Sequence, residues 1–183
     1  MNLYQQNFLL KFMFGRNTKT EDEYLDKCIR LAYKDMLSSG RYYVKKDINS
    51  FVCRFKYILQ KDNYVFSRAL IDNASKLLSD EETIFNGRDY ATRYGLGQKV
   101  VNMTFKYFYI ARDFLNVKIN FSNCDCPLDS VILKDLGTIN AWSKIDKYEY
   151  EKCQKIISNK LSKKKLTSEL LSLGNLAYDF MKW

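Results

Sequence analysis

Residues 94–115 read YGLGQKVVNMTFKYFYIARDFL, and apolar side chains occupy nearly every side of the helix that this stretch would form. A helix on the surface of a globular protein normally shows one apolar stripe and one polar face. A helix with so little polar face belongs in the middle of a fold. The stretch therefore predicts a central, buried helix with other elements packed around it.

Helical spacing of apolar residues continues on both sides of this stretch. Thr20 is followed three residues later by Glu23, the spacing of a capping box, which predicts a helix over 20–38. Asp47 is a candidate cap for a second helix, which contains the apolar residues between 48 and 59. The other expected elements are a helix over 64–78, a short broken helix over 81–93, a helix over 127–136 with Pro127 at its first position, a long segment over 141–160 and a final helix over 167–183.

Composition agrees with a helical fold. The chain has 183 residues, of which 46% are hydrophobic, and it contains one proline and seven glycines. These turn-forming residues are too few for a sandwich or barrel with many tight turns. One domain is the default at this length. We therefore expect a single all-α domain over 1–183.

The charge balance points to a polyanionic partner, because 30 Lys and Arg against 21 Asp and Glu leave a net charge of +9. A run of four lysines between 160 and 165 is interpreted as a solvated linker, with phosphate contact as the alternative. No run of about 18 apolar residues exists, so no membrane partner is expected. An odd number of cysteines, five, fits a reducing compartment, and the expected location is the cytoplasm.

The absence of histidine removes several chemistries. A Ser/His/Asp triad, a Cys/His pair and every mixed Cys/His zinc site need a residue that this chain lacks. Cys124 and Cys126 form a lone Cys-x-Cys without a second pair, so they are interpreted as two loop thiols and no metal site is expected. Catalysis would have to use Lys, Asp, Glu, Tyr, Ser or Cys.

Two motifs carry a candidate chemistry. In the first, Gly95-Leu96-Gly97-Gln98-Lys99, the glycines allow a tight turn between two helices and a close approach of backbone N–H groups to a phosphate. In the second, Pro127-Leu128-Asp129, a carboxylate lies in the first turn of a helix, 30 residues after Lys99. Two helix starts could thus present an amine and a carboxylate to one cleft.

The position at a helix start suits both groups for chemistry on a sugar. The positive end of the helix dipole disfavours a protonated amine and favours an ionised carboxylate. Only a neutral amine is nucleophilic, so Lys99 is a candidate nucleophile, and Asp129 could stabilise positive charge that develops on a sugar ring. The plain alternatives are an exposed lysine or phosphate clamp for Lys99, and ordinary charge complementarity at a helix N-terminus for Asp129.

These residues resemble the helix-hairpin-helix superfamily of DNA glycosylases. Its signature is a hairpin of the form Leu-Pro-Gly-Val-Gly-x-Lys and, downstream, Pro-Val-Asp near a helix start. Residues 93–100, RYGLGQKV, and residues 127–129, PLD, correspond to these motifs. The long interval between Lys99 and Asp129, and Lys106 seven residues after Lys99, are most similar to the archaeal-type 8-oxoguanine glycosylase branch. The chain departs from the signature at Tyr94, where the family has proline, and at Val131, where it often has histidine.

The resemblance implies a fold and an activity. The fold would be a helix-hairpin-helix bundle with its catalytic region at about 94–136. The activity would be base-excision repair of double-stranded DNA carrying an oxidised purine such as 8-oxoguanine, with a hydrolase and an AP lyase step through a lysine Schiff base. Lys99 would be the nucleophile and Asp129 the essential aspartate. The hairpin that holds DNA would be formed by Tyr94, Gly95, Leu96, Gly97 and Gln98.

The resemblance also bears on the base pocket and on cofactors. Trp142, Tyr90 and Phe85 are candidates for stacking on an extruded base. No iron–sulfur cluster is expected, because its cysteine pattern is absent, and a monovalent cation at the hairpin is the one candidate ion. A monomer is expected. Two alternatives are a non-catalytic helical protein that binds nucleic acid, acting in phage conflict or regulation, and a helical protein-interaction module.

Overall fold

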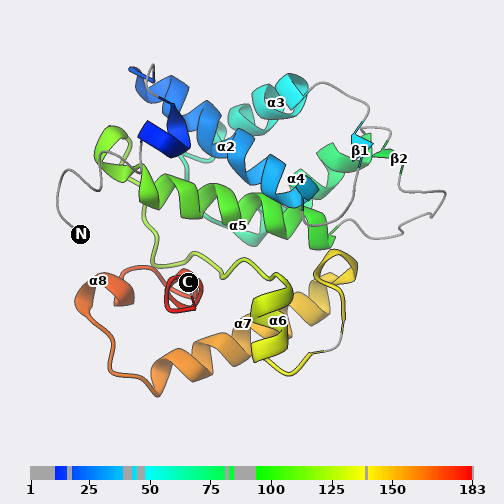
Figure 1. The fold of residues 1–183 in the computed structure, drawn as a ribbon, viewed down its shortest axis with the longest axis vertical. Helices are drawn as coiled ribbons and strands as arrows, with labels where there is room; N and C mark the ends of the chain where they lie inside the picture. Colours follow the sequence, from blue (N-terminus) through cyan, green and yellow to red (C-terminus); the bar gives the residue numbers. More distant parts are fainter. Residues whose placement is uncertain are drawn as a thin grey trace.

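A computed structural model describes residues 11–15, 18–38, 43–44, 48–80, 83–84, 94–138 and 140–182. Helices dominate these residues, which confirms the all-α prediction (Figure 1). The bounds of the longer helices are α2 Glu21–Ser38, α3 Ile48–Lys61, α4 Arg68–Asp80, α5 Tyr94–Ile110 and α7 Lys147–Ser162. The shorter ones are η1 Arg112–Phe114, α6 Ser130–Asp135, η2 Trp142–Lys144, α8 Ser168–Leu171 and α9 Leu176–Phe180.

Helix α5 lies across the middle of the fold, as its apolar surround predicts. Every residue from Tyr94 to Phe105 is buried. Helices α2 and α4 pack against α5, and η2 and α7 also contact it. In Figure 1, α2 and α3 lie on one side of α5, and α6 to α8 lie on the other. The central helix therefore connects two groups of helices.

The capping box at the start of α2 is confirmed. The Glu23 N–H donates to Thr20 Oγ1 at 3.2 Å, and the Thr20 N–H donates to Glu23 Oε2 at 3.3 Å. Each residue thus satisfies a main-chain donor of the other at the helix start. Helix α3 begins at Ile48, and its candidate cap, Asp47, lies outside the described residues.

Two expected helices have different bounds. The helix expected from residue 64 begins at Arg68, because Asn63 and Tyr64 have positive φ angles of 50° and 56° and end α3 in a left-handed turn. The helix expected over 167–183 is divided into α8 and α9. Gly174 lies between them with φ +56°, and a Cβ there would come within 2.9 Å of the Cys124 carbonyl oxygen.

Three further expectations concern the segments 81–93, 127–136 and 141–160. Within 81–93, the described residues Thr83–Ile84 form a short strand, β2, paired antiparallel with β1, Tyr43–Val44, so the helix expected there is wrong at these two positions. The helix expected from Pro127 begins only at Ser130. The long segment over 141–160 contains η2 and then α7, whose cap is Asp146.

All five cysteines are free thiols, and four of them are buried. Cys53 is the exposed one. No helix in the described part of the chain combines the length and the hydropathy that a membrane span needs.

Candidate functional site

Lys99 and Asp129, which the sequence places 30 residues apart, meet in the fold. The Lys99 Nζ lies 3.2 Å from Asp129 Oδ2. Lys99 is only 5% exposed, and the Asp129 side chain is 15% exposed. An ion pair shielded from water to this degree is stronger electrostatically than a surface pair, although burying it costs desolvation energy.

Asp129 is the N-cap of α6, one position before the first turn in which the sequence placed it. Its Oδ1 accepts hydrogen bonds from the N–H groups of Val131 and Ile132, both at 3.0 Å. Its Oδ2 is thereby left for Lys99. One carboxylate oxygen anchors the residue to its own helix, and the other faces the amine. This arrangement explains why Pro127 lies outside the helix, since the cap requires a non-helical residue at 129.

The extended segment before Asp129 is held by a glutamine of α5. Gln98 Nε2 donates to the Leu128 carbonyl at 2.9 Å, and its Oε1 accepts from the Leu128 N–H at 3.1 Å. Gln98 is fully buried. Because Gln98 directly precedes Lys99, the same turn of α5 fixes the backbone of 128 and supplies the amine that meets 129.

A second glutamine, Gln154 of α7, holds Cys126 in the same manner. Its Oε1 accepts from the Cys126 N–H at 3.0 Å, and its Nε2 donates to the Cys126 carbonyl at 2.7 Å. Asn102 Nδ2 adds a contact to the Tyr150 hydroxyl at 2.9 Å. The side-chain amides of Gln98 and Gln154 thus bond the main-chain N–H and carbonyl groups of Leu128 and Cys126, as a neighbouring strand would in a sheet. These bonds set the position of the Asp129 carboxylate.

Arg68 and Tyr150 anchor the start of this segment. Arg68 Nε donates to Asp125 Oδ2 at 2.8 Å, and the Tyr150 hydroxyl donates to the same oxygen at 3.1 Å. Asp125 is 5% exposed. Burial raises the pKa of Tyr150, and the charge of Asp125 adds to this rise, so the phenol stays protonated and remains a donor.

A second ion pair involves Lys106, which lies seven residues, or about two turns, after Lys99 on α5. Lys106 Nζ lies 2.6 Å from Asp179 Oδ2, and Asp179 is 1% exposed. Burial raises the pKa of Asp179, while the charges of Lys106 and Lys99 oppose the rise. Burial also raises the pKa of Cys126, which lies near both pairs, so its thiol is protonated and is not a nucleophile.

The hairpin residues Tyr94, Gly95, Leu96, Gly97 and Gln98 are all buried within the first turns of α5. A Cβ on Gly95 would lie 2.8 Å from the Ser143 carbonyl carbon, and a Cβ on Gly97 would lie 2.8 Å from the Ile71 carbonyl oxygen. The glycines therefore permit close approach of η2 and α4 to the central helix. The tight turn expected at these glycines is therefore wrong, because Gly95 and Gly97 lie inside α5, and Lys99 is the sixth residue of that helix and not part of its first turn.

The base-pocket candidates are only partly placed. Trp142 is 7% exposed, and the backbone of η2, which contains it, lies against Gly95. Tyr90 and Phe85 lie outside the described residues. The Tyr94 ring packs edge-on against Tyr150 at a centroid distance of 5.5 Å, and its buried hydroxyl makes no hydrogen bond with a described residue. Burial raises the pKa of this phenol.

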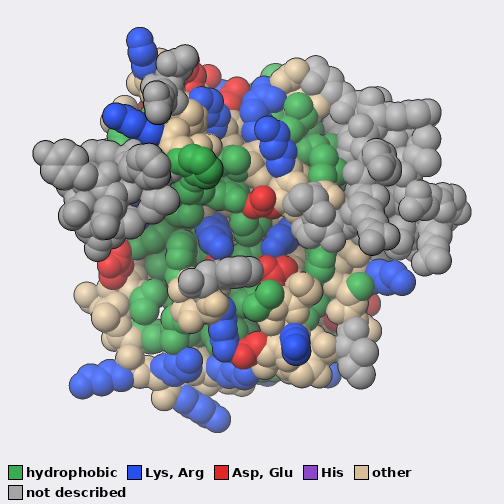
Figure 2. All heavy atoms as spheres, in the orientation of Figure 1, with side chains coloured by type: hydrophobic (Ala, Val, Ile, Leu, Met, Phe, Trp, Pro, Cys, Tyr) green, Lys and Arg blue, Asp and Glu red, His purple; other side chains and the backbone are tan. Residues whose placement is uncertain are grey.

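Basic side chains gather in two places on the face that Figure 2 shows. Some lie beside acidic side chains in the middle of the face, and others lie along the lower edge, over the C-terminal part of α7. Within the described ranges, no three Cys, Asp or Glu side chains come close enough together to hold a metal ion.

Sequence reasoning missed Gln98 and Gln154 as positioning residues. Both are polar residues at positions that the apolar pattern assigns to the core. This pattern could have pointed to them, because a buried amide needs hydrogen-bond partners.

A comparison of the chain with protein-family models, with curated proteins and with solved structures finds no match.

Proposed function

We propose that this protein is a DNA base-excision enzyme, a glycosylase with AP lyase activity that acts through Lys99. Its substrate would be double-stranded DNA that carries an oxidised purine such as 8-oxoguanine. The observation that carries the proposal is the contact between the Lys99 amine and the Asp129 carboxylate at 3.2 Å. The motif resemblance, which includes the same two residues, supports it.

The ion pair offers a route to a neutral nucleophile. Transfer of one proton from Lys99 Nζ to Asp129 Oδ2 leaves a free electron pair on nitrogen, and that pair forms a bond to C1′ of the deoxyribose. The bond from C1′ to the base breaks, and its electron pair leaves with the base, which takes up a proton. The proton that the base takes up is the one that Asp129 Oδ2 accepted from Lys99, so the carboxylate is ionised again as positive charge develops on the sugar ring and would stabilise that charge.

The covalent adduct then leads to strand cleavage. Opening of the sugar ring gives a Schiff base between Nζ and C1′, and this group acidifies the proton on C2′. Loss of that proton expels the 3′ phosphate by β-elimination. All of these steps use a lysine and a carboxylate, so no cofactor is required for them. The excess of positive charge, +9, would draw the enzyme to intracellular DNA.

Borohydride trapping tests the proposal. Borohydride reduces a Schiff base to a stable amine, so a lyase becomes covalently attached to its substrate. Duplexes with 8-oxoguanine, uracil or an abasic site are incubated with the protein, with and without borohydride. We expect trapping on at least one lesion, its loss in Lys99→Gln, and unchanged trapping in Lys144→Gln, an exposed lysine of η2. Equal trapping by the wild type and Lys99→Gln would contradict the role of Lys99.

A second candidate function is nucleic-acid binding without catalysis. One observation favours it: the Lys99 amine is paired with Asp129 and the residue is only 5% exposed, so the amine is shielded from a substrate, while the net charge of +9 still favours a polyanionic partner. On this hypothesis, a gel-shift experiment would show the same salt-dependent binding to damaged and undamaged duplexes, with no released base and no trapped adduct.

A further inference from the structure

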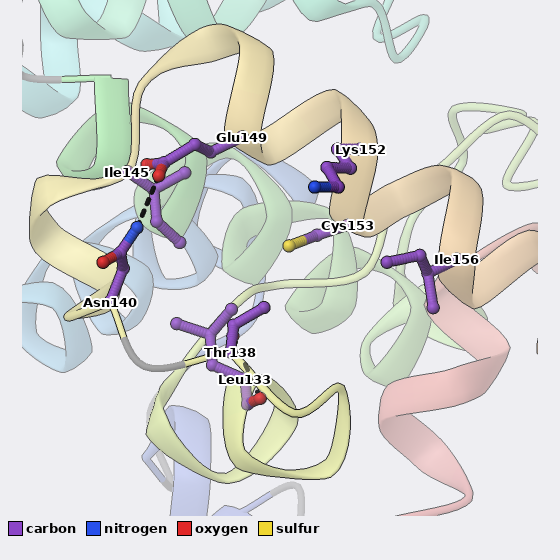
Figure 3. Close-up of a pocket in the computed structure, with 8 residues that line it drawn as sticks. All are labelled: Leu133, Thr138, Asn140, Ile145, Glu149, Lys152, Cys153 and Ile156. Atoms are coloured by element: carbon purple, nitrogen blue, oxygen red, sulfur yellow. Dashed lines mark hydrogen bonds between the residues drawn. The ribbon is translucent and has the colours of Figure 1, made fainter.

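The structure contains a pocket whose lining includes neither Lys99 nor Asp129. It has a volume of about 280 Å³ and lies between α6, the segment before η2 and the N-terminal half of α7 (Figure 3). Its lining includes eight described residues: Leu133, Thr138, Asn140, Ile145, Glu149, Lys152, Cys153 and Ile156. Sites for drug-sized ligands begin at about 300 Å³, so this pocket suits a smaller body, the size of one heterocyclic ring system.

The walls of the pocket are apolar. Leu133, Ile145 and Ile156 contribute aliphatic side chains from three different segments. Figure 3 shows the sulfur of Cys153 pointing into the hollow. Burial raises the pKa of this thiol, so it forms part of an uncharged wall. Such walls favour a flat, weakly hydrated ligand.

One end of the pocket accepts hydrogen bonds. Asn140 Nδ2 donates to Glu149 Oε1, which fixes the carboxylate at the pocket (Figure 3). An ionised carboxylate accepts hydrogen bonds and donates none. A ligand seated here therefore needs N–H groups on the edge that faces Glu149, and guanine has two adjacent ones on its Watson–Crick edge.

The rim of the pocket is positively charged. Lys152 lines the hollow and begins an exposed stripe that continues along α7 through Lys155 and Asn159 to Lys163, the residue that caps the end of the helix. Steps of three and four residues keep these positions on one face of a helix. Neither Lys152 nor Lys155 forms an ion pair with another described residue. Both lysines are exposed, which suits them to contact with phosphates.

We propose that this pocket binds an unstacked nucleobase, preferentially guanine, while the lysine stripe of α7 binds the attached phosphate. Apolar walls, a carboxylate at one end and ammonium groups at the rim match the three parts of a nucleotide: flat faces, an N–H edge and an anion. The ligand comes from a free nucleotide or from a single strand. This site does not use Lys99 or Asp129, so it does not depend on the glycosylase proposal.

Isothermal titration calorimetry of the full chain tests the site, with guanosine 5′-monophosphate as the probe and ribose 5-phosphate as its base-free control. We expect the nucleotide to bind at least tenfold more tightly than the sugar phosphate, because the base adds buried contacts. Glu149→Gln should weaken nucleotide binding about tenfold, since it replaces an ionised acceptor by a neutral one. Lys152→Gln should weaken it severalfold, and Lys144→Gln, off the rim, should leave it unchanged.

Cys153→Met fills the hollow and leaves every charge in place, so it should abolish nucleotide binding. A thermal melt checks that this variant folds, and the surface variants at 149 and 152 test the site if it does not. Lys99→Gln should bind the nucleotide as the wild type does, even if the glycosylase proposal fails. The proposal is overturned if the nucleotide binds no more tightly than ribose 5-phosphate, or if Glu149→Gln and a folded Cys153→Met both bind it unchanged.

A guanine-containing 12-mer separates the two sources of the ligand. If a strand is the ligand, the 12-mer binds more tightly than the mononucleotide and loses affinity in Lys163→Gln, while the mononucleotide does not. If the free nucleotide is the ligand, the 12-mer gains nothing and Lys163→Gln changes neither. Both results support the site, because both require the base in the pocket and the phosphate on Lys152.

Discussion

Replacement of Gln98 by methionine isolates the hydrogen bonds that position Asp129. Methionine has nearly the volume of glutamine and packs well in a core, so the change removes polar contacts and leaves little cavity. The Leu128 N–H and carbonyl both lose their partner, and Leu128 is fully buried. A buried main-chain group without a partner costs about 1–3 kcal/mol. Two such groups give an expected loss of about 2–6 kcal/mol in the free energy of unfolding.

Urea denaturation followed by circular dichroism measures this loss. A domain of this kind has a total of about 5–15 kcal/mol to lose, so the midpoint should move clearly. Gln60→Met is the matched control, because Gln60 is an exposed glutamine of α3, and it should change the free energy by no more than about 0.5 kcal/mol. Borohydride trapping, where the wild type shows it, should fall with Gln98→Met. A change in stability below about 0.5 kcal/mol would refute the claim that Gln98 holds Leu128 and Asp129 in place.

Three further changes test other parts of the structure. Gly95→Ala should destabilise the fold by about 1–3 kcal/mol in the same urea assay, because its Cβ meets the backbone of η2, and a gain in stability would contradict this close approach. Hydrogen bonds from Lys182, from the Tyr178 hydroxyl and from Lys160 lower the pKa of Asp135, so the Asp135→Asn variant should be less stable than the wild type at pH 7. The difference in stability should begin to shrink below about pH 4 and disappear as the pH falls through the pKa of Asp135 in the folded state. A difference that grows as the pH falls would contradict this assignment. A thiol reagent should react quickly with one thiol, Cys53, and with all five only after denaturation; fast reaction of a second thiol would show that a cysteine described as buried is accessible.

The general arrangement of the fold could be predicted because it follows from local patterns. Helix α5 carries apolar side chains on nearly every side, so it has to be buried, and the capping box of α2 depends on two residues only three positions apart. The division of the last helix at Gly174 follows instead from the approach of Ser122 and Cys124, which lie 52 and 50 positions earlier in the chain. A single sequence does not reveal contacts of that kind.

The candidate site shows the same division. The residue types and the spacing of the motifs were sufficient to single out Lys99 and Asp129, and the structure brings the two together. The predicted position of Asp129 in its helix was wrong by one residue. Pro127 suggested that the helix begins at 127 and that Asp129 lies in its first turn, but Asp129 is the N-cap and the helix begins at Ser130. Gln98 and Gln154 could not be assigned as positioning residues, since their partners are main-chain groups of a segment far away in the sequence.

Peptide mapping of the borohydride-reduced adduct tests the central claim most directly. The protein is trapped on its substrate duplex and digested with a protease, and mass spectrometry then identifies the lysine that carries the reduced sugar. We expect a single modified residue, Lys99, and no modification at Lys106, seven residues along the same helix. A sugar attached to any other lysine, or no attached sugar on any lesion, would contradict the assignment of the Lys99 amine as the nucleophile.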